Sequence, residues 1–191
     1  MPSQALTDWM TVRLMRLNEF DHQISNNVPP LSLTLQDGNL RAYVMLLSAD
    51  FQGFCRDLYS ECTQKFATAL TPELATVMQF QCSANRLLEK TNPSYKAIKS
   101  DFGRFGIIVA NALAPDQMTK ANNDRRKTHL ERLGLWRNYC AHHNPAEPQK
   151  AGVFSLAAVR EWKVSCAEFA AELDRIMGDF IKAQTKVQPW E

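Results

Sequence analysis

Residues 39–61 read NLRAYVMLLSADFQGFCRDLYSE, a stretch in which apolar side chains recur at steps of three and four. This spacing places them on one face of an α-helix, because one turn takes about 3.6 residues. The pattern continues to about residue 69 and predicts one long helix with a single buried face over residues 39–69. Its apolar stripe consists of Leu40, Tyr43, Val44, Leu47, Phe51, Phe54, Leu58 and Phe66.

The same periodicity extends over most of the chain. Thr71-Pro72 is a strong helix start, and Ser155 is a good cap for a final helix. Asn122-Asn123-Asp124 is expected to cap the start of the predicted helix over residues 123–143. The additional predicted helices cover residues 4–25, 72–90, 123–143 and 155–185.

Two segments follow no long helical pattern. Residues 31–35 alternate apolar and polar side chains, which is typical of a short strand or an extended connector, and Asp37-Gly38-Asn39 is expected to be a turn. The sequence of residues 95–115 predicts short helical segments on either side of a loop at 101–106.

These elements predict an all-α fold, namely an antiparallel helical bundle of four to five main helices plus short extra ones. A length of 191 residues suits a single domain over residues 1–191. Residues 185–191 are expected to be a frayed tail.

The composition is that of an ordinary globular domain, with 45% hydrophobic and 22% charged residues. The net charge of +2 neither requires nor excludes a nucleic-acid partner. The five cysteines are odd in number and contain no CxxC pair, which indicates reduced thiols in a cytoplasmic protein. We expect no metal site, no cofactor and no association with a membrane.

The stretch most suggestive of chemistry is LGLWRNYCAHHNP at residues 133–145. It places Arg137, Asn138 and His142 on the last turns of a predicted helix, which Asn144-Pro145 is expected to stop. Asn138 and His142 lie one turn apart and about 40° apart around the axis, so they share a face. The neighbouring His143 is a possible alternative to His142, although His142 is preferred because of that shared face.

These residue types suit cleavage of RNA without a metal, in which the 2′-hydroxyl attacks the adjacent phosphate. Histidine can transfer protons near neutral pH, and arginine offers a permanent charge to the phosphate oxygens. Asparagine can orient either group or contact the ribose. The reaction needs a base for the 2′-hydroxyl and an acid for the leaving 5′-oxygen, and a single histidine supplies only one of them at a time. This chemistry therefore favours a homodimer whose composite site holds two copies of each residue.

The predicted helix carrying this stretch is basic, with six Lys or Arg against two acids between residues 118 and 137. Arg125, Arg126, Lys127 and Arg132 are therefore candidate RNA contacts. Trp136 and Tyr139 could stack on bases, although core packing is the more common role of aromatics at this spacing. Arg41 and Arg56, on the early helix, are possible additional residues of the same cleft.

The motif and its context resemble the HEPN superfamily. Arg137 to His142 (RNYCAH) is similar to its R-x4-H motif, with the favoured Asn after the Arg, and residues 39–61 resemble its early long helix. The resemblance implies a bundle that dimerises through the motif helices and an endoribonuclease that leaves 2′,3′-cyclic phosphate and 5′-hydroxyl ends. It also implies single-stranded RNA or tRNA as substrate, a toxin–antitoxin, anti-phage or stress-defence role, and an antitoxin or defence partner protein. The tyrosine that follows the histidine in one toxin branch is replaced here by Asn144, so control by its modification is not expected.

Simpler interpretations remain for the same residues. Arg137, His142 and His143 suit a helix C-terminus because cations there interact favourably with the helix dipole. The basic run can be a solvated face, and His22 and His129 are expected on the surface. The whole motif can also belong to a non-catalytic HEPN-like module that binds RNA, nucleotide or a partner protein, or to a helical interaction protein.

Overall fold

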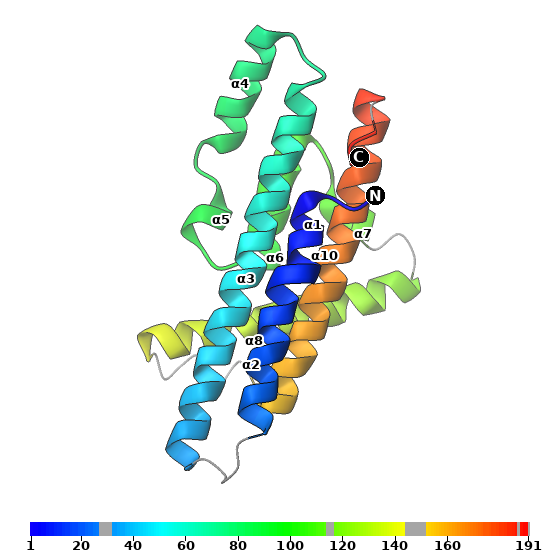
Figure 1. Ribbon diagram of the computed structural model, residues 1–191. Coiled ribbons are helices and arrows are strands. Elements are labelled where there is room, and N and C mark those ends of the chain that lie inside the picture. The colour runs from blue at the N-terminus through cyan, green and yellow to red at the C-terminus, as the bar shows by residue number, and fades with distance from the viewer. Residues whose placement is uncertain (27–31, 114–116, 144–151, 187, 191) are drawn as a thin grey trace.

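The computed structural model describes residues 1–26, 32–113, 117–143, 152–186 and 188–190 (Figure 1). Within these ranges the regular secondary structure is helical and contains no β-strand. The predicted all-α fold class is therefore confirmed. None of the helices in these ranges is long and apolar enough to cross a membrane.

The first predicted helix is confirmed over its full length. It consists of α1 (Gln4–Asp8), a π-helical turn (Trp9–Arg13) and α2 (Leu14–Ser25). Ser3 caps its start, because its hydroxyl accepts a hydrogen bond from the backbone N–H of Leu6 at 3.0 Å.

Helix α3 (Leu33–Ala67) begins earlier than predicted. The strand or connector expected at 31–35 and the turn at 37–39 are wrong for the described residues, since helix already covers residues 33–39. Ser32 provides the cap, accepting from the N–H of Leu35 at 3.4 Å. The ion pair between Arg41 and Asp37, at 2.6 Å and one turn apart, also supports this first part of the helix.

The chain after α3 is more broken than the periodicity suggested. Helix α4 (Pro72–Ser83) starts where predicted but ends before residue 90, because Ala84 takes an extended conformation with ψ 128° and Asn85 a left-handed one with φ 55°. A short helix, α5 (Leu87–Lys90), follows. The buried carboxylate of Asp101 caps α5, because it accepts hydrogen bonds from the first two backbone N–H groups of that helix, those of Leu87 at 3.0 Å and Leu88 at 2.8 Å.

Asp101 itself belongs to α6 (Tyr95–Phe102), so the predicted loop at 101–106 begins with helix. A 3₁₀ turn (Gly103–Phe105) ends at Gly106, whose φ of 90° favours glycine. Helix α7 (Val109–Leu113) completes this region and confirms its short helical pieces.

Two long helices form the rest of the described chain. Helix α8 (Gln117–His142) carries the candidate site and starts before the predicted 123–143. Asn123 does not cap it but is buried within it, at 3% exposure. Helix α10 (Leu156–Thr185) agrees with the prediction, and Ser155 caps it by accepting from the N–H of Ala158 at 3.2 Å.

The helices form a bundle with one crossing member. Helix α3 runs antiparallel to α1 and α2, and α10 lies alongside them (Figure 1). Helix α8 instead runs across these long helices and packs against α3 and α10 (Figure 1). Its middle is therefore anchored in the bundle, while its C-terminal end extends to the side.

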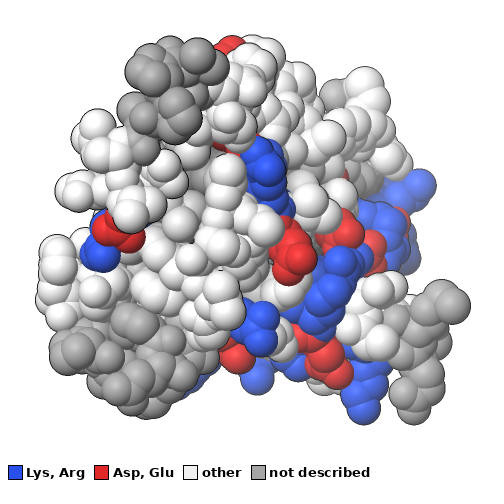
Figure 2. Space-filling model, turned by 90° about the horizontal axis from the view of Figure 1, so that it is seen from below, with Lys and Arg blue, Asp and Glu red and all other residues white. Residues whose placement is uncertain are grey.

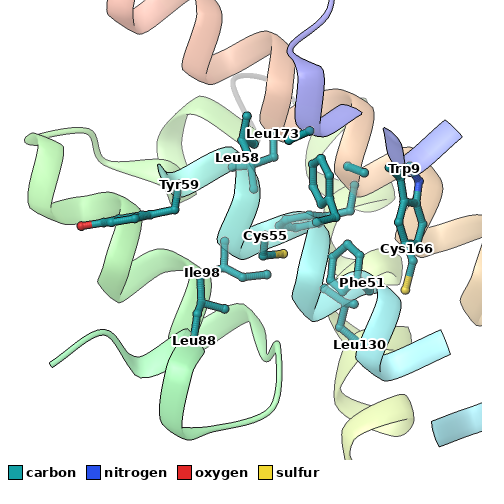
Figure 3. Close-up of a cluster of buried hydrophobic side chains, with 14 of the residues drawn as sticks. Trp9, Phe51, Cys55, Leu58, Tyr59, Leu88, Ile98, Leu130, Cys166 and Leu173 are labelled. Carbon is teal, nitrogen blue, oxygen red and sulfur yellow. The ribbon is translucent and has the colours of Figure 1, made fainter. Parts of the chain in front are cut away.

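The core joins α1, α3, α8 and α10 around large apolar side chains (Figure 3). Cys55 and Cys166 lie within it at 0% exposure, and burial raises the pKa of both thiols. They therefore act as small protonated packing groups, as expected.

The end of the chain also contributes to the core. Trp190 is only 6% exposed and lies over Gly178, where a Cβ atom would come within 2.6 Å of the indole Nε1. The predicted fraying of residues 185–191 is therefore wrong for Trp190, because the absence of a side chain at Gly178 makes room for its ring.

Candidate active site

The two adjacent histidines occupy different positions at the end of α8. His142 is the last helical residue and its side chain is exposed. His143 leaves the helix with φ 55°, and the centre of its ring lies 6.0 Å from the centre of the Tyr139 ring. Its N–H still bonds to the Tyr139 carbonyl at 2.8 Å, which closes the last turn. His142 alone thus continues the helical face of Asn138, one turn further along. Asn144-Pro145, the expected stop, lies outside the described residues.

Arg137 and Asn138 lie together on the preceding turn. The Arg137 Nη1 atom is 3.5 Å from Asn138 Oδ1, a distance at the weak end of hydrogen bonding. Asn92 Nδ2 donates a much shorter bond of 2.6 Å to the same oxygen. The Asn138 amide is thus oriented mainly by Asn92, a residue between α5 and α6 that the sequence did not point to. No local signal near Asn92 could have identified it, because the two positions are 46 residues apart.

Beside Asn138 the surface has a hollow of about 450 Å³. The turn before α6 forms one wall, and one face of α8 forms the other. Gly134 and Asn138 are one turn apart on that face, and His142 follows one turn later. The hollow is lined by Thr91, Asn92, Ser94, Leu130, Glu131, Gly134, Leu135 and Asn138.

The basic residues nearer the start of α8 are largely paired with acids. Arg125 Nη2 and Arg126 Nε both bond to Glu168 Oε2 of α10, at 2.5 and 3.2 Å. Partial burial alone would raise the pKa of Glu168, but these hydrogen bonds hold it below its usual value. One ionised carboxylate therefore offsets part of the charge of two candidate RNA contacts.

Lys127 is paired as well, with its Nζ 3.0 Å from Asp124 Oδ1 and 5.0 Å from the centre of the Tyr95 ring. Arg132 is exposed and has no ion pair within the described part of the chain. On the face seen in Figure 2, Lys and Arg side chains interleave with Asp and Glu instead of forming one continuous basic patch.

The aromatic residues of α8 serve mainly in packing. Trp136 is 7% exposed and stacks on Phe154 at 4.1 Å between ring centres, which confirms the core interpretation. Tyr139 is half-buried, and the Arg41 guanidinium covers its ring at 5.0 Å. Of the two arginines proposed for the same cleft, Arg41 thus lies beside α8. Arg56 instead donates a hydrogen bond to the backbone carbonyl of Leu88, at 2.9 Å.

His129 is not the simple surface residue that was predicted. Its Nδ1 atom lies 2.8 Å from the hydroxyl of Ser165, which is fully buried on α10. Partial burial lowers the pKa of His129, and the nearby Arg132 and Arg125 act in the same direction against Glu161. His129 is therefore a link between α8 and α10. His22, in contrast, is exposed as expected.

Among residues in the described ranges, no three His, Cys, Asp or Glu side chains are grouped to hold a metal ion. The sequence-predicted candidates for chemistry are Arg137, Asn138 and His142, and the structure adds Asn92, which bonds to Asn138. No protein-family model, curated protein or solved structure matches this chain.

Proposed function

We propose that the protein is a metal-independent, HEPN-like endoribonuclease that cleaves RNA to 2′,3′-cyclic phosphate and 5′-hydroxyl ends. The observation that supports this best is the end of α8, where Arg137 and an exposed His142 flank an Asn138 amide held by Asn92. No carboxylate in the described residues is ion-paired with Arg137.

In this reaction the ribose 2′-oxygen forms a bond to phosphorus and the bond from phosphorus to the 5′-oxygen breaks. One imidazole takes the proton of the 2′-hydroxyl, and a protonated imidazole gives a proton to the departing 5′-oxygen. Arg137 stabilises the charge on the phosphorane oxygens through its guanidinium. Asn138 orients the reacting groups.

Two imidazoles are needed if the base and the acid act in one step. A homodimer that places two α8 ends side by side supplies His142 twice, together with two copies of Arg137. The expected substrate is single-stranded RNA or tRNA, in the cytoplasm. A toxin–antitoxin, anti-phage or stress-defence role, with an antitoxin or defence partner, follows from the HEPN resemblance.

The test is incubation of the purified protein with labelled single-stranded RNA and with tRNA in excess EDTA, followed by analysis of the product ends. The matched variants are His142→Ala and His143→Ala, which remove neighbouring rings of the same kind. Cleavage to cyclic-phosphate ends that only His142→Ala abolishes is the expected result. Equal cleavage by the parent and both variants would identify a contaminating nuclease and contradict the proposal.

The alternative is a non-catalytic HEPN-like module that binds RNA, nucleotide or a partner protein at the same place. The hollow beside Asn138 favours it, because a volume of about 450 Å³ lies in the range of small-molecule sites. Binding of RNA that weakens with salt, without any cleavage at high protein concentration, would identify this alternative.

A further inference from the structure

We infer that the exposed apolar face of α4 binds a second copy of this chain, in an antiparallel helix pair centred on Val77. The surface lies outside the proposed active site. In Figure 1, α4 packs along one half of α3, whereas α8 crosses the other half. The inference therefore does not rest on the proposed function.

Helix α4 is attached to the rest of the molecule along a narrow stripe. Cys82 is its only buried residue, and Ala75 and Met78 are partly buried. These three positions are three and four residues apart, so they share one face of the helix. Among the helices that the structure describes, only α3 packs extensively against α4. Most of the surface of α4 is therefore free to contact another molecule.

This free surface carries large apolar side chains. Leu74, Val77 and Phe80 are 57%, 58% and 71% exposed. Leu70, just before the helix, is 41% exposed and completes what we call the α4 face. Glu73 is the only charged residue between positions 66 and 85, whereas the outer face of a surface helix is normally polar and charged. A contiguous apolar face with so little charge is typical of a protein–protein contact.

The order of residues around Val77 makes the α4 face complementary to a copy of itself. At 100° per residue, Leu74 and Phe80 lie about 60° to either side of Val77, and Glu73 and Gln81 about 40° to either side. A twofold axis through Val77 makes the two helices antiparallel. Leu74 of each copy then faces Phe80 of the other. Glu73 faces Gln81, whose amide can donate to the carboxylate, so the acid does not meet its own copy.

The area of the α4 face suits a weak dimer. Its four apolar side chains expose roughly 400 Å² per chain, so two copies bury roughly 800 Å² of apolar surface. Polar groups at the rim bring the total to about 1,200 Å², the lower end for specific complexes. The segment has no Lys or Arg between positions 66 and 85, which makes it unsuited to RNA. We therefore expect self-association with a Kd on the order of 10 µM.

The experiment is sedimentation equilibrium of the full chain over about 1 to 200 µM, which brackets that Kd. Val77→Asp is the test variant, because it places two like charges on the twofold axis and Val77 is exposed in the single chain. Gln79→Asp is the matched control, since Gln79 is also exposed on α4 but lies about 200° from Val77 around the axis. Circular dichroism verifies that both variants fold.

We expect the parent and Gln79→Asp to reach about twice the mass of Val77→Asp at the highest concentration. This ratio holds whether or not the ends of α8 also pair, because that contact is unchanged in all three proteins. Equal masses of the parent and Val77→Asp would overturn the inference. Neither result depends on RNA cleavage, so a failure of the proposed function would leave these masses unchanged.

A second set of variants tests the antiparallel arrangement. Leu74→Asp and Phe80→Lys should each associate at least about tenfold more weakly than the parent, because each places a charge against an apolar side chain. Mixing the two should restore association, since the new carboxylate of one copy faces the new ammonium of the other. A mixture of Leu74→Asp with Leu74→Lys should not, because those positions lie about 9 Å apart along the paired helices. Equal recovery in both mixtures would overturn the arrangement centred on Val77.

Discussion

The two ends of α8 carry cations in different surroundings. Towards its start, Arg125 and Arg126 share the carboxylate of Glu168. Towards its end, Arg137 has no ion pair within the described residues, and its Nη1 atom lies 3.5 Å from Asn138 Oδ1. A count of basic residues along the helix treats these ends alike. The comparison teaches that charge available to a phosphate depends on acids supplied by other helices.

The largest expected difference between the two ends is in catalysis. Arg137→Ala should lower RNA cleavage by about 100-fold or more, because the charge on the phosphorane oxygens loses its cation. Arg125→Ala should change the rate by less than about threefold, since Arg125 is already paired with Glu168 and exposed. Single-turnover rates measure both, with circular dichroism to verify folding. Equal losses in the two variants would remove the distinction between the ends.

The next effect concerns the support of Asn138. Asn92→Ala should reduce cleavage by about tenfold, because Asn138 loses the 2.6 Å bond that orients its amide. The matched comparison is Asn138→Ala and the double variant. If Asn92 acts through Asn138, the double variant should be no worse than Asn138→Ala. Fully additive losses would show that Asn92 acts independently of Asn138.

A smaller effect, on RNA affinity, is expected when the Glu168 charge that pairs with the start of α8 is removed. Glu168→Gln leaves Arg125 and Arg126 without a counter-charge, so RNA should bind about threefold more tightly at low salt and with a steeper salt dependence. Glu172→Gln is the control, because Glu172 pairs with Arg175 on α10 itself, at 2.6 Å. Filter binding over a salt series measures both. Unchanged binding in Glu168→Gln would exclude Arg125 and Arg126 as RNA contacts.

The smallest effect is a dependence of stability on pH at the link between α8 and α10. Partial burial lowers the pKa of His129 in the folded protein, so the unfolded chain binds a proton more readily. The contribution of neutral His129 is therefore complete above its unfolded pKa of about 6.5 and decreases as pH falls below it. Urea unfolding at pH 7.5 and 5.5 should show a greater loss of stability in the parent than in His129→Gln. The same loss in both proteins would contradict this assignment.

Helices with strong local signals could be predicted from the sequence alone. The apolar period and Ser155 located α10, and the period alone located the helix over residues 4–25. The start of α3 was missed because Asp37-Gly38-Asn39 is typical of a turn, whereas a cap at Ser32 and the Arg41–Asp37 pair favour helix there. The position of Trp190 was missed because chain ends usually fray and its partner, Gly178, has no side chain to suggest a contact.

The sequence by itself determined the all-α class and the placement of Arg137, Asn138 and His142 on the last turns of one helix. Both follow from local periodicity and from the spacing of residues along a helix. Only the tertiary structure decided that Asn92 holds Asn138 and that Glu168 pairs with Arg125 and Arg126. These partners are 46, 43 and 42 positions apart in the chain, so only the packing of α8 against its neighbours brings them together.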